Sequence, residues 1–451
     1  MRKPNSFSLP FFLLGLGSQL QIIASLSMTE AFALAAAPIL FFSELPYMRR
    51  NGIMTFWWFS MAVVVGGVIS CIANHTMFDF ALRGMATACL LPCSIVIGHW
   101  ILRKNMNGFK WMIVGAALSE ILCTYVFQRS VEVAKAAQGI ASSGGVAVNA
   151  ADIMQGPLFW IMRLGALIML PIKGWYLSCP ISYSVAAPLF MVGFSLLTTT
   201  SGRSTALGAL GMAALVLIGG KTRKNMKRIC KYFWLLVFLA VAGAFAAKGA
   251  YRIVATSGGL GEKARDKYES QTKGNKGMMA LLLGGRMESF AGLLACVDKP
   301  IVGFGPWPMD ETGYTEEFLR RFGNEEDYER YVSVQAAYAS HGVRILRLIP
   351  GHSYITGFWL VYGISGLLFW FYVIFILLRY LKQDCWAVPQ WYFWLAAAIP
   401  GMFWNIFFSP FGDRFGSMVF IVAILLTRAV RTGRQPLPRE MIEEIVRLEG
   451  R

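Results

Sequence analysis

The sequence predicts an all-α polytopic membrane protein with about twelve transmembrane helices and one large, mainly helical loop domain outside the membrane. Three observations predict this fold class. Long uncharged apolar runs recur along most of the chain, and 56% of its residues are hydrophobic. Only 15% of the residues are charged. The polar residues gather in short loops and in one long stretch, 248–363.

The apolar runs follow one another in order along the chain. Runs of about 18 or more such residues are long enough to cross the hydrocarbon core. The predicted spans are 10–27, 29–44, 54–73, 79–101, 111–127, 157–172, 181–198, 204–220, 232–247, 364–380, 391–408 and 415–428. The first run has a basic start but no small-residue cleavage site after it, so we expect a retained helix. The predicted organisation is helices 1–9 in 1–247, the loop domain in 248–363, helices 10–12 in 364–430 and a tail in 431–451.

The basic residues orient this arrangement. The chain has 42 Lys and Arg against 25 Asp and Glu, an excess that would suggest a nucleic-acid partner in a soluble protein. Here the excess falls in alternate loops, as positive-inside sorting requires, so we expect no nucleic-acid partner. The run KTRKNMKRICK at 221–231 is the densest example, and it acts as a topology anchor or, alternatively, as a lipid-binding patch. The N-terminus and the tail are therefore predicted to be cytoplasmic and the loop domain to face outward.

Cysteine usage predicts neither disulfides nor a metal centre. The eight cysteines are scattered, and no CxxC or Cys/His set is present. No cofactor and no metal are expected.

The stretch GRMESFAGLLACVDKPIVGFGPW, residues 285–307, predicts a docked amphipathic helix that begins near Arg286. Its predicted apolar face consists of residues at helical spacing, Met287, Phe290, Leu293, Leu294 and Val297. Pro300 is expected to end this helix, and the Gly and Pro residues that follow predict a rigid bend.

Three polar positions are predicted to converge on the outward side. Arg203 lies among small residues in TTTSGRSTALG, Arg286 begins the docked helix, and His352 follows Pro350–Gly351 at the start of a helix that returns to the membrane. A histidine near a helix N-terminus tends to stay neutral, because the helix dipole disfavours its charged form. A neutral imidazole can accept a proton from a hydroxyl group.

These motifs, in this order, resemble the O-antigen ligase and O-antigen polymerase superfamily. The resemblance rests on S-G-R, then R-x-x-x-aromatic with P-x-x-G-x-G, then H-S-x-aliphatic and aromatic-G-I-S-G-L, and covers about residues 200–380. Phe290 stands where the family often has Trp, and the stretch between GFGPW and His352 is longer than is usual in the family. The resemblance implies a bacterial inner-membrane protein whose active site faces the periplasm or the cell exterior.

The resemblance also implies an activity. Family members move a glycan from an undecaprenyl pyrophosphate carrier to a hydroxyl on a lipid- or carrier-linked acceptor, without a nucleotide sugar or a metal. On this chain, His352 would be the general base, and Arg203 and Arg286 would bind the pyrophosphate. Arginine's planar fork suits this task, because fixed cations stabilise the charge that grows on the leaving pyrophosphate. Direct attack by the acceptor would invert the anomeric centre.

Each of these residues also has a purely structural interpretation. Arg203 can snorkel at the membrane interface, Arg286 can pair with Glu288, and His352 can be a satisfied residue at a helix start.

Further ionisable groups are weaker candidates. Arg83 and Arg163 lie toward the outer ends of their spans and are candidates for extending the cationic site. Asp413 and Arg414 either support a catalytic group or form a surface pair. Glu120, within a span, is as compatible with a structural role as with a functional one. Three tyrosines either stack on sugar rings or pack within the loop domain: Tyr314, Tyr328 and Tyr331. The remaining histidines are expected to be solvated loop residues or, for His99, to lie at a cytoplasmic helix end: His75, His341 and His99.

Two other functions stay open at the level of sequence. The first is a polysaccharide polymerase of the same superfamily, which would use the same donor site. The second is a transporter or flippase for a lipid-linked glycan, which predicts broken helices and a site near the membrane midplane. A large outward domain that carries the polar groups favours an enzyme.

Overall fold

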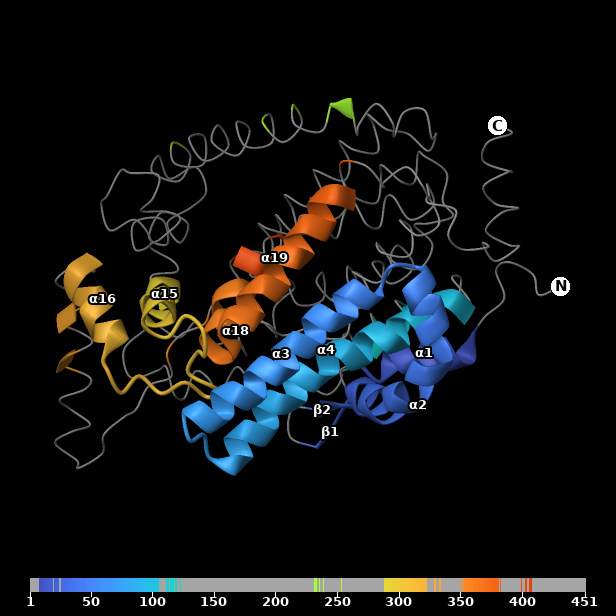
Figure 1. The fold of residues 1–451 in the computed structure, drawn as a ribbon, viewed down its shortest axis with the longest axis horizontal. Helices are drawn as coiled ribbons and strands as arrows, with labels where there is room; N and C mark the ends of the chain where they lie inside the picture. The colour runs from blue at the N-terminus through green and yellow to red at the C-terminus, as the bar shows by residue number, and fades with distance from the viewer. Residues whose placement is uncertain are drawn as a thin grey trace, which may run out of the picture.

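The computed structural model describes residues 8–18, 20–23, 26–104, 288–322 and 353–380, together with scattered residues within 111–122, 231–253, 328–333, 349–351 and 382–407. This part of the chain is mostly helical (Figure 1). The helices are α1 (Leu9–Leu16), α2 (Met28–Arg50), α3 (Met54–Ala73), α4 (Phe78–Lys104), α15 (Glu288–Asp298), α16 (Tyr314–Phe322), α18 (Tyr354–Tyr362) and α19 (Ile364–Arg379).

The N-terminal segment differs from the prediction. The helix expected over 10–27 ends at Leu16, and two short antiparallel strands follow, β1 (Gln21–Ile23) and β2 (Leu26–Ser27). The single span predicted there is therefore wrong in extent. Helix α2 begins directly after β2, since Ser27 and Glu30 form a capping box that satisfies two backbone N–H groups at its start.

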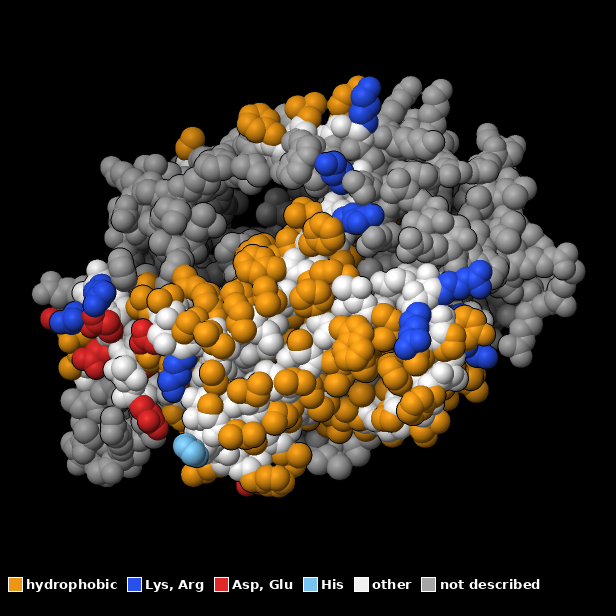
Figure 2. Space-filling model, in the orientation of Figure 1, with side chains coloured by type: hydrophobic (Ala, Val, Ile, Leu, Met, Phe, Trp, Pro, Cys, Tyr) orange, Lys and Arg blue, Asp and Glu red, His pale blue; other side chains and the backbone are white. Residues whose placement is uncertain are grey.

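Among the residues that the structure describes, three helices are long and apolar enough to cross a membrane: α2, α3 and α4. The bounds of α3 match the predicted span, 54–73, and those of α4 extend the prediction of 79–101 by one residue at its start and three at its end. Many large apolar side chains on these helices are exposed, which is the arrangement that a lipid environment stabilises. Figure 2 shows this hydrophobic surface, with the charged side chains toward the ends of the helices. The chain is thus a membrane protein.

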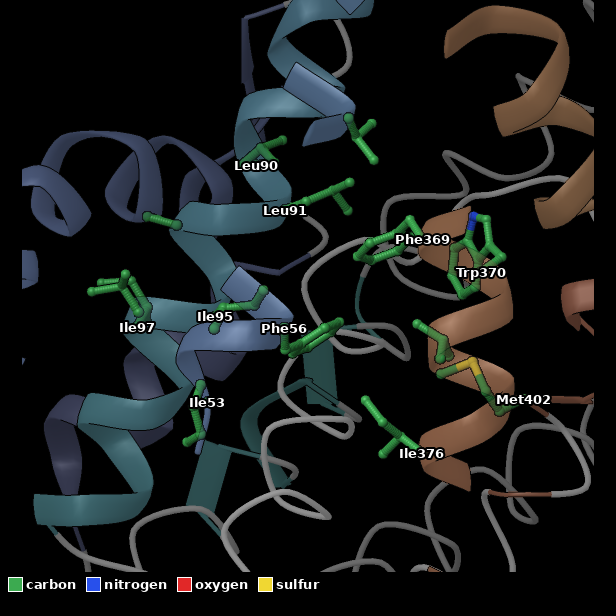
Figure 3. Close-up of a cluster of buried hydrophobic side chains, with 14 of the residues drawn as sticks. Ile53, Phe56, Leu90, Leu91, Ile95, Ile97, Phe369, Trp370, Ile376 and Met402 are labelled. Carbon is green, nitrogen blue, oxygen red and sulfur yellow. The ribbon is translucent and has the colours of Figure 1, made fainter. Parts of the chain in front are cut away.

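Helices α18 and α19 pack across α3 to form the core. Phe56 of α3 stacks on Phe369 of α19 with ring centroids 5.7 Å apart, and Trp370 is fully buried beside them (Figure 3). Gly66 permits this close crossing, because a Cβ atom there would lie 2.1 Å from the Ser365 Oγ. The core therefore joins the first membrane helices to α18, at the end of the predicted loop domain, and to α19, which follows it.

Of the predicted loop domain, residues 248–363, the described structure includes the helices α15, α16 and α18. Helices α15 and α16 pack against one another, and α15 also packs against α18 (Figure 1). A second, smaller core lies between α15 and α18 and consists of Ala295, Cys296, Ile349 and Leu360.

Candidate functional site

The Pro/Gly turn after α15, residues 299–307, is bound to the junction between α18 and α19. Phe304 donates its backbone N–H to the Leu360 carbonyl at 2.6 Å, and Ile364 donates to the Ile301 carbonyl at 3.0 Å. Gly363 separates the two helices with φ +63°, and a Cβ atom there would fall 1.9 Å from the Ile301 oxygen. Only glycine fits this position, so the helix break and the turn depend on each other.

The same turn is bound to the corner between α3 and α4. Asn74, which caps the end of α3, donates from Nδ2 to the Gly303 carbonyl at 3.0 Å. The Lys299 ammonium donates to the Asn74 Oδ1 at 2.9 Å and lies 4.7 Å from the centre of the Phe304 ring. Asn74 therefore uses both ends of its amide to hold the turn, a role that the sequence analysis missed.

Helix α4 forms a third contact with the turn. A Cβ atom at Gly84 would lie 2.2 Å from Pro306, so the backbone of α4 approaches the proline ring directly. Tyr362 donates its hydroxyl to the Gly84 carbonyl at 2.9 Å, and Trp307 stacks on Phe80 with ring centroids 5.4 Å apart. The predicted site residue Arg83 therefore lies on α4, one position before this contact.

Helix α15 is docked as predicted, but through the opposite face. The expected apolar face included Leu293 and Val297, and both side chains are exposed. The buried residues are small, namely Ala291, Ala295 and Cys296. Small side chains let α15 approach α18 closely, which explains why they, rather than the larger apolar residues, form the packed face.

The thiol of Cys296 shows how tight this packing is. Its Sγ lies 3.7 Å from the Thr356 carbonyl oxygen in α18. Burial raises the pKa of the Cys296 thiol to about 12. The group is therefore inert and structural rather than a nucleophile.

The start of α18 is capped by a side chain. Ser353 is the N-cap residue, and its hydroxyl accepts a hydrogen bond from the Thr356 N–H at 3.0 Å. The helix that the sequence predicted to start at His352 thus begins at Tyr354.

Most of the predicted site residues lie outside the described residues. These are Arg163, Arg203, Arg286, His352, Asp413 and Arg414, and the same holds for Glu120, Tyr331 and His341. Of the proposed site, Arg83 is placed, on α4 as described above. The described helices α15 and α18 begin two residues after Arg286 and His352, respectively.

The loop domain places Tyr314 in a packing role. Its ring meets Phe304 edge-on with centroids 5.7 Å apart, and its hydroxyl donates to the Asp298 Oδ2 at 2.8 Å. Burial, with this hydrogen bond to the carboxylate, raises the pKa of the Tyr314 phenol. Asp310 starts α16 by accepting three backbone N–H groups, those of residues 313–315, at 2.7 to 2.9 Å.

A cluster of polar side chains lies near the C-terminal ends of α2 and α4, away from the turn of residues 299–307. The buried Glu44 carboxylate accepts two hydrogen bonds from Arg103 Nε, at 2.9 and 3.1 Å, and lies 2.8 Å from the His99 Nδ1. Asn51 Nδ2 lies 3.0 Å from the His99 Nε2, so both ring nitrogens of His99 have polar neighbours. Sequence reasoning had placed His99 at a helix end and missed its burial. The available signal was a glutamate and a histidine within apolar helices.

Among the described residues, no group of His, Cys, Asp and Glu side chains comes together that could hold a metal ion. No protein-family model, curated protein or solved structure matches the chain.

Proposed function

We propose that the chain is a membrane glycosyltransferase that moves a glycan from undecaprenyl pyrophosphate to an acceptor sugar hydroxyl, as an O-antigen ligase does. The observation that carries the proposal is the ordered set of motifs around Arg203, Arg286, the Pro/Gly turn and His352, which resembles this superfamily. It would act at the bacterial inner membrane, with the active site on the outer side.

The described structure supports this proposal through the helices α15 and α18 and the turn of residues 299–307 that is bound to them. Helix α15 follows Arg286 closely in sequence, and α18 follows His352 closely. These two helices share a core and are joined by the bonds between the turn and the α18–α19 junction. A catalytic pair needs elements that hold its members in fixed geometry, and a rigid frame of this kind meets that need.

In the proposed reaction the acceptor hydroxyl oxygen attacks the anomeric carbon. The bond from that carbon to the carrier's pyrophosphate breaks, and the pyrophosphate leaves with the electron pair. His352 accepts the hydroxyl proton, and Arg203 and Arg286 stabilise the charge on the leaving group, with Arg83 and Arg163 as further cations. Because pyrophosphate is a good leaving group, the reaction needs neither a general acid nor a metal.

The test is sugar transfer from a lipid-pyrophosphate glycan to an acceptor in liposomes. We expect His352→Ala and Arg286→Ala each to lower the rate by about a hundredfold or more. Two matched controls lie elsewhere: His75→Asn replaces an exposed histidine whose φ of +48° suits asparagine, and Arg321→Ala removes an exposed arginine of α16. Transfer at the parent rate by both site variants would refute the assignment.

A transporter for the same lipid-linked glycan is the second candidate. The observation that favours it is the cluster of the buried Glu44 and His99 with the partly exposed Arg103, since ionisable groups inside membrane helices often mark a transport path. Flux across sealed vesicles without a covalent product would identify a transporter. A polymerase would instead form a covalent product in which one carrier-linked glycan extends another.

A further inference from the structure

The exposed side of α15 is apolar. Leu293 and Val297 are 40% and 63% exposed, and Ile301, at the start of the turn, is 73% exposed. Leu293 and Val297 are four residues apart, so they form one ridge on the side of the helix opposite the buried Ala291 and Ala295. We call Leu293, Val297 and Ile301 the α15 ridge.

The α15 ridge lies at the level where membrane helices end. The turn after it is hydrogen-bonded to Asn74, the residue that ends α3, and to Ile364, the residue that begins α19. Helix α3 is a candidate membrane span, and α19 is an apolar helix that packs beside it. The ends of both helices therefore fix the turn at the surface of the bilayer.

The α15 ridge also continues the lipid-facing surface of the spans. Ile301 is bonded through its backbone to Ile364, whose side chain is 39% exposed, and Leu368 lies one turn further along α19 and is 47% exposed. Figure 2 shows hydrophobic side chains running from the region of α15 across to α19, with a basic side chain between that region and the near end of α3.

The water side of the same domain is marked by charge. Helix α16 packs against α15 and exposes an acidic and basic surface, with Arg320 and Arg321 both paired to Glu317. Trp307 stacks on Phe80 at the turn, and Trp359 donates its indole N–H to the Pro300 carbonyl at 2.9 Å. Tryptophans with an apolar ring and a satisfied polar group are typical of the boundary between lipid and water.

We propose that α15 is an interfacial helix whose ridge of Leu293, Val297 and Ile301 lies among the acyl chains of the adjacent leaflet. The part of the loop domain that α15 begins is then seated in the membrane surface, with α16 on its water side. This inference rests on the described helices and is independent of the proposed enzyme activity.

The test places the photoreactive residue p-benzoylphenylalanine at 293, 297 or 301 in the full chain in lipid nanodiscs. Two positions calibrate the yield: Phe371, on the exposed apolar side of α19, and Glu316, exposed on α16. After illumination, mass spectrometry of the peptides measures the lipid adduct. We expect yields at the ridge similar to that at 371 and at least about tenfold above that at 316.

Three outcomes would overturn the proposal. Lipid adducts at the ridge no more frequent than at 316 would place it in water. Crosslinks to a second copy of the chain, or to another protein, would show a protein interface instead. The third outcome comes from a second measurement, on the unmodified protein. Hydroxyl-radical oxidation in nanodiscs should be weak at Val297 and Ile301, as it should be at Phe371, and strong oxidation at both would contradict burial in lipid.

Discussion

The contact between Gly84 and Pro306 decides whether Gly84→Ala stabilises or destabilises the folded protein. In a helix that makes no contact at this point, Gly84→Ala would stabilise the protein by about 1 kcal/mol, because alanine has the higher helix propensity. Here the new methyl group would lie 2.2 Å from Pro306, whereas ordinary contacts begin at 3.4 Å. Helix α4 and the turn would have to move apart by more than 1 Å.

Two costs follow from that separation. Overpacking of this size costs about 1–3 kcal/mol. The hydrogen bond from Tyr362 to the Gly84 carbonyl would be stretched as well, which adds about 1 kcal/mol. Subtracting the propensity gain leaves a net destabilisation of about 1–3 kcal/mol, the opposite sign to that of an uncontacted site.

The assay is denaturant unfolding of the purified protein in detergent, followed by tryptophan fluorescence. Ala81→Gly, on the same helix, gives the propensity term alone. Pro306→Gly removes the Cβ and Cγ atoms of the proline, which are the two atoms that the new methyl group would meet at 2.2 Å. In the Pro306→Gly background, Gly84→Ala should therefore destabilise the protein by about 1–2 kcal/mol less than it does in the parent. If Gly84→Ala stabilises the parent protein, or if the Pro306→Gly background does not change its effect, the contact does not carry the energy assigned to it.

Three other substitutions or measurements test separate features. Glu44→Gln should destabilise the protein by about 2–4 kcal/mol in the same unfolding assay, because Arg103 loses its buried carboxylate partner. Adding Arg103→Met should restore part of that loss. If the free-energy changes of the two substitutions simply add, the pairing is contradicted. At pH 8, a thiol with a pKa of about 12 in place of 9.0 has about a thousandfold less thiolate, so Cys296 in the native protein should be alkylated about a thousandfold more slowly than an ordinary thiol. The alkylation rate should rise with pH up to about pH 12. Alkylation at the rate of an ordinary thiol would show that the thiol is accessible to solvent. Asp310→Ala should cost about 1–2 kcal/mol locally and speed amide exchange in the first turn of α16, with Asp310→Asn intermediate; unchanged exchange would mean that the cap is not needed.

The sequence predicted α3 to the residue because its signal is local and complete. An unbroken apolar run lies between Asn51–Gly52 and Asn74–His75, and both flanks are residues that end helices. In the N-terminal run, residues 17–21 read GSQLQ, a polar interruption that follows the end of α1 at Leu16 and that the predicted span of 10–27 passed over. The Ser27–Glu30 capping box was the local signal that marked the start of α2.

The packed face of α15 could not be predicted from amphipathicity. That rule assumes that large apolar side chains avoid water and therefore turn toward the protein. Next to lipid, Leu293 and Val297 gain as much from acyl chains as from protein, and close packing then favours the face with Ala291 and Ala295. The hydrogen bond from Asn74 to Gly303 could not be predicted for another reason. An asparagine at a helix end is already explained by capping that helix, and Gly303 lies 229 residues away in sequence.

The bonds around the turn also restrict the path by which the proposed lipid-linked substrate would reach this end of the molecule. Gly66 brings α3 so close to Ser365 that no space for an acyl chain is left between α3 and α19. The turn then closes the same crossing from the membrane surface, since it is bonded to Asn74 on one side and to Ile364 on the other. Separation of α3 from α19 would break at least one of these two bonds. If the chain takes the lipid-linked substrate proposed above, the carrier would approach this end along the outside of the helix pair, and α15, with its apolar ridge, lies on that surface.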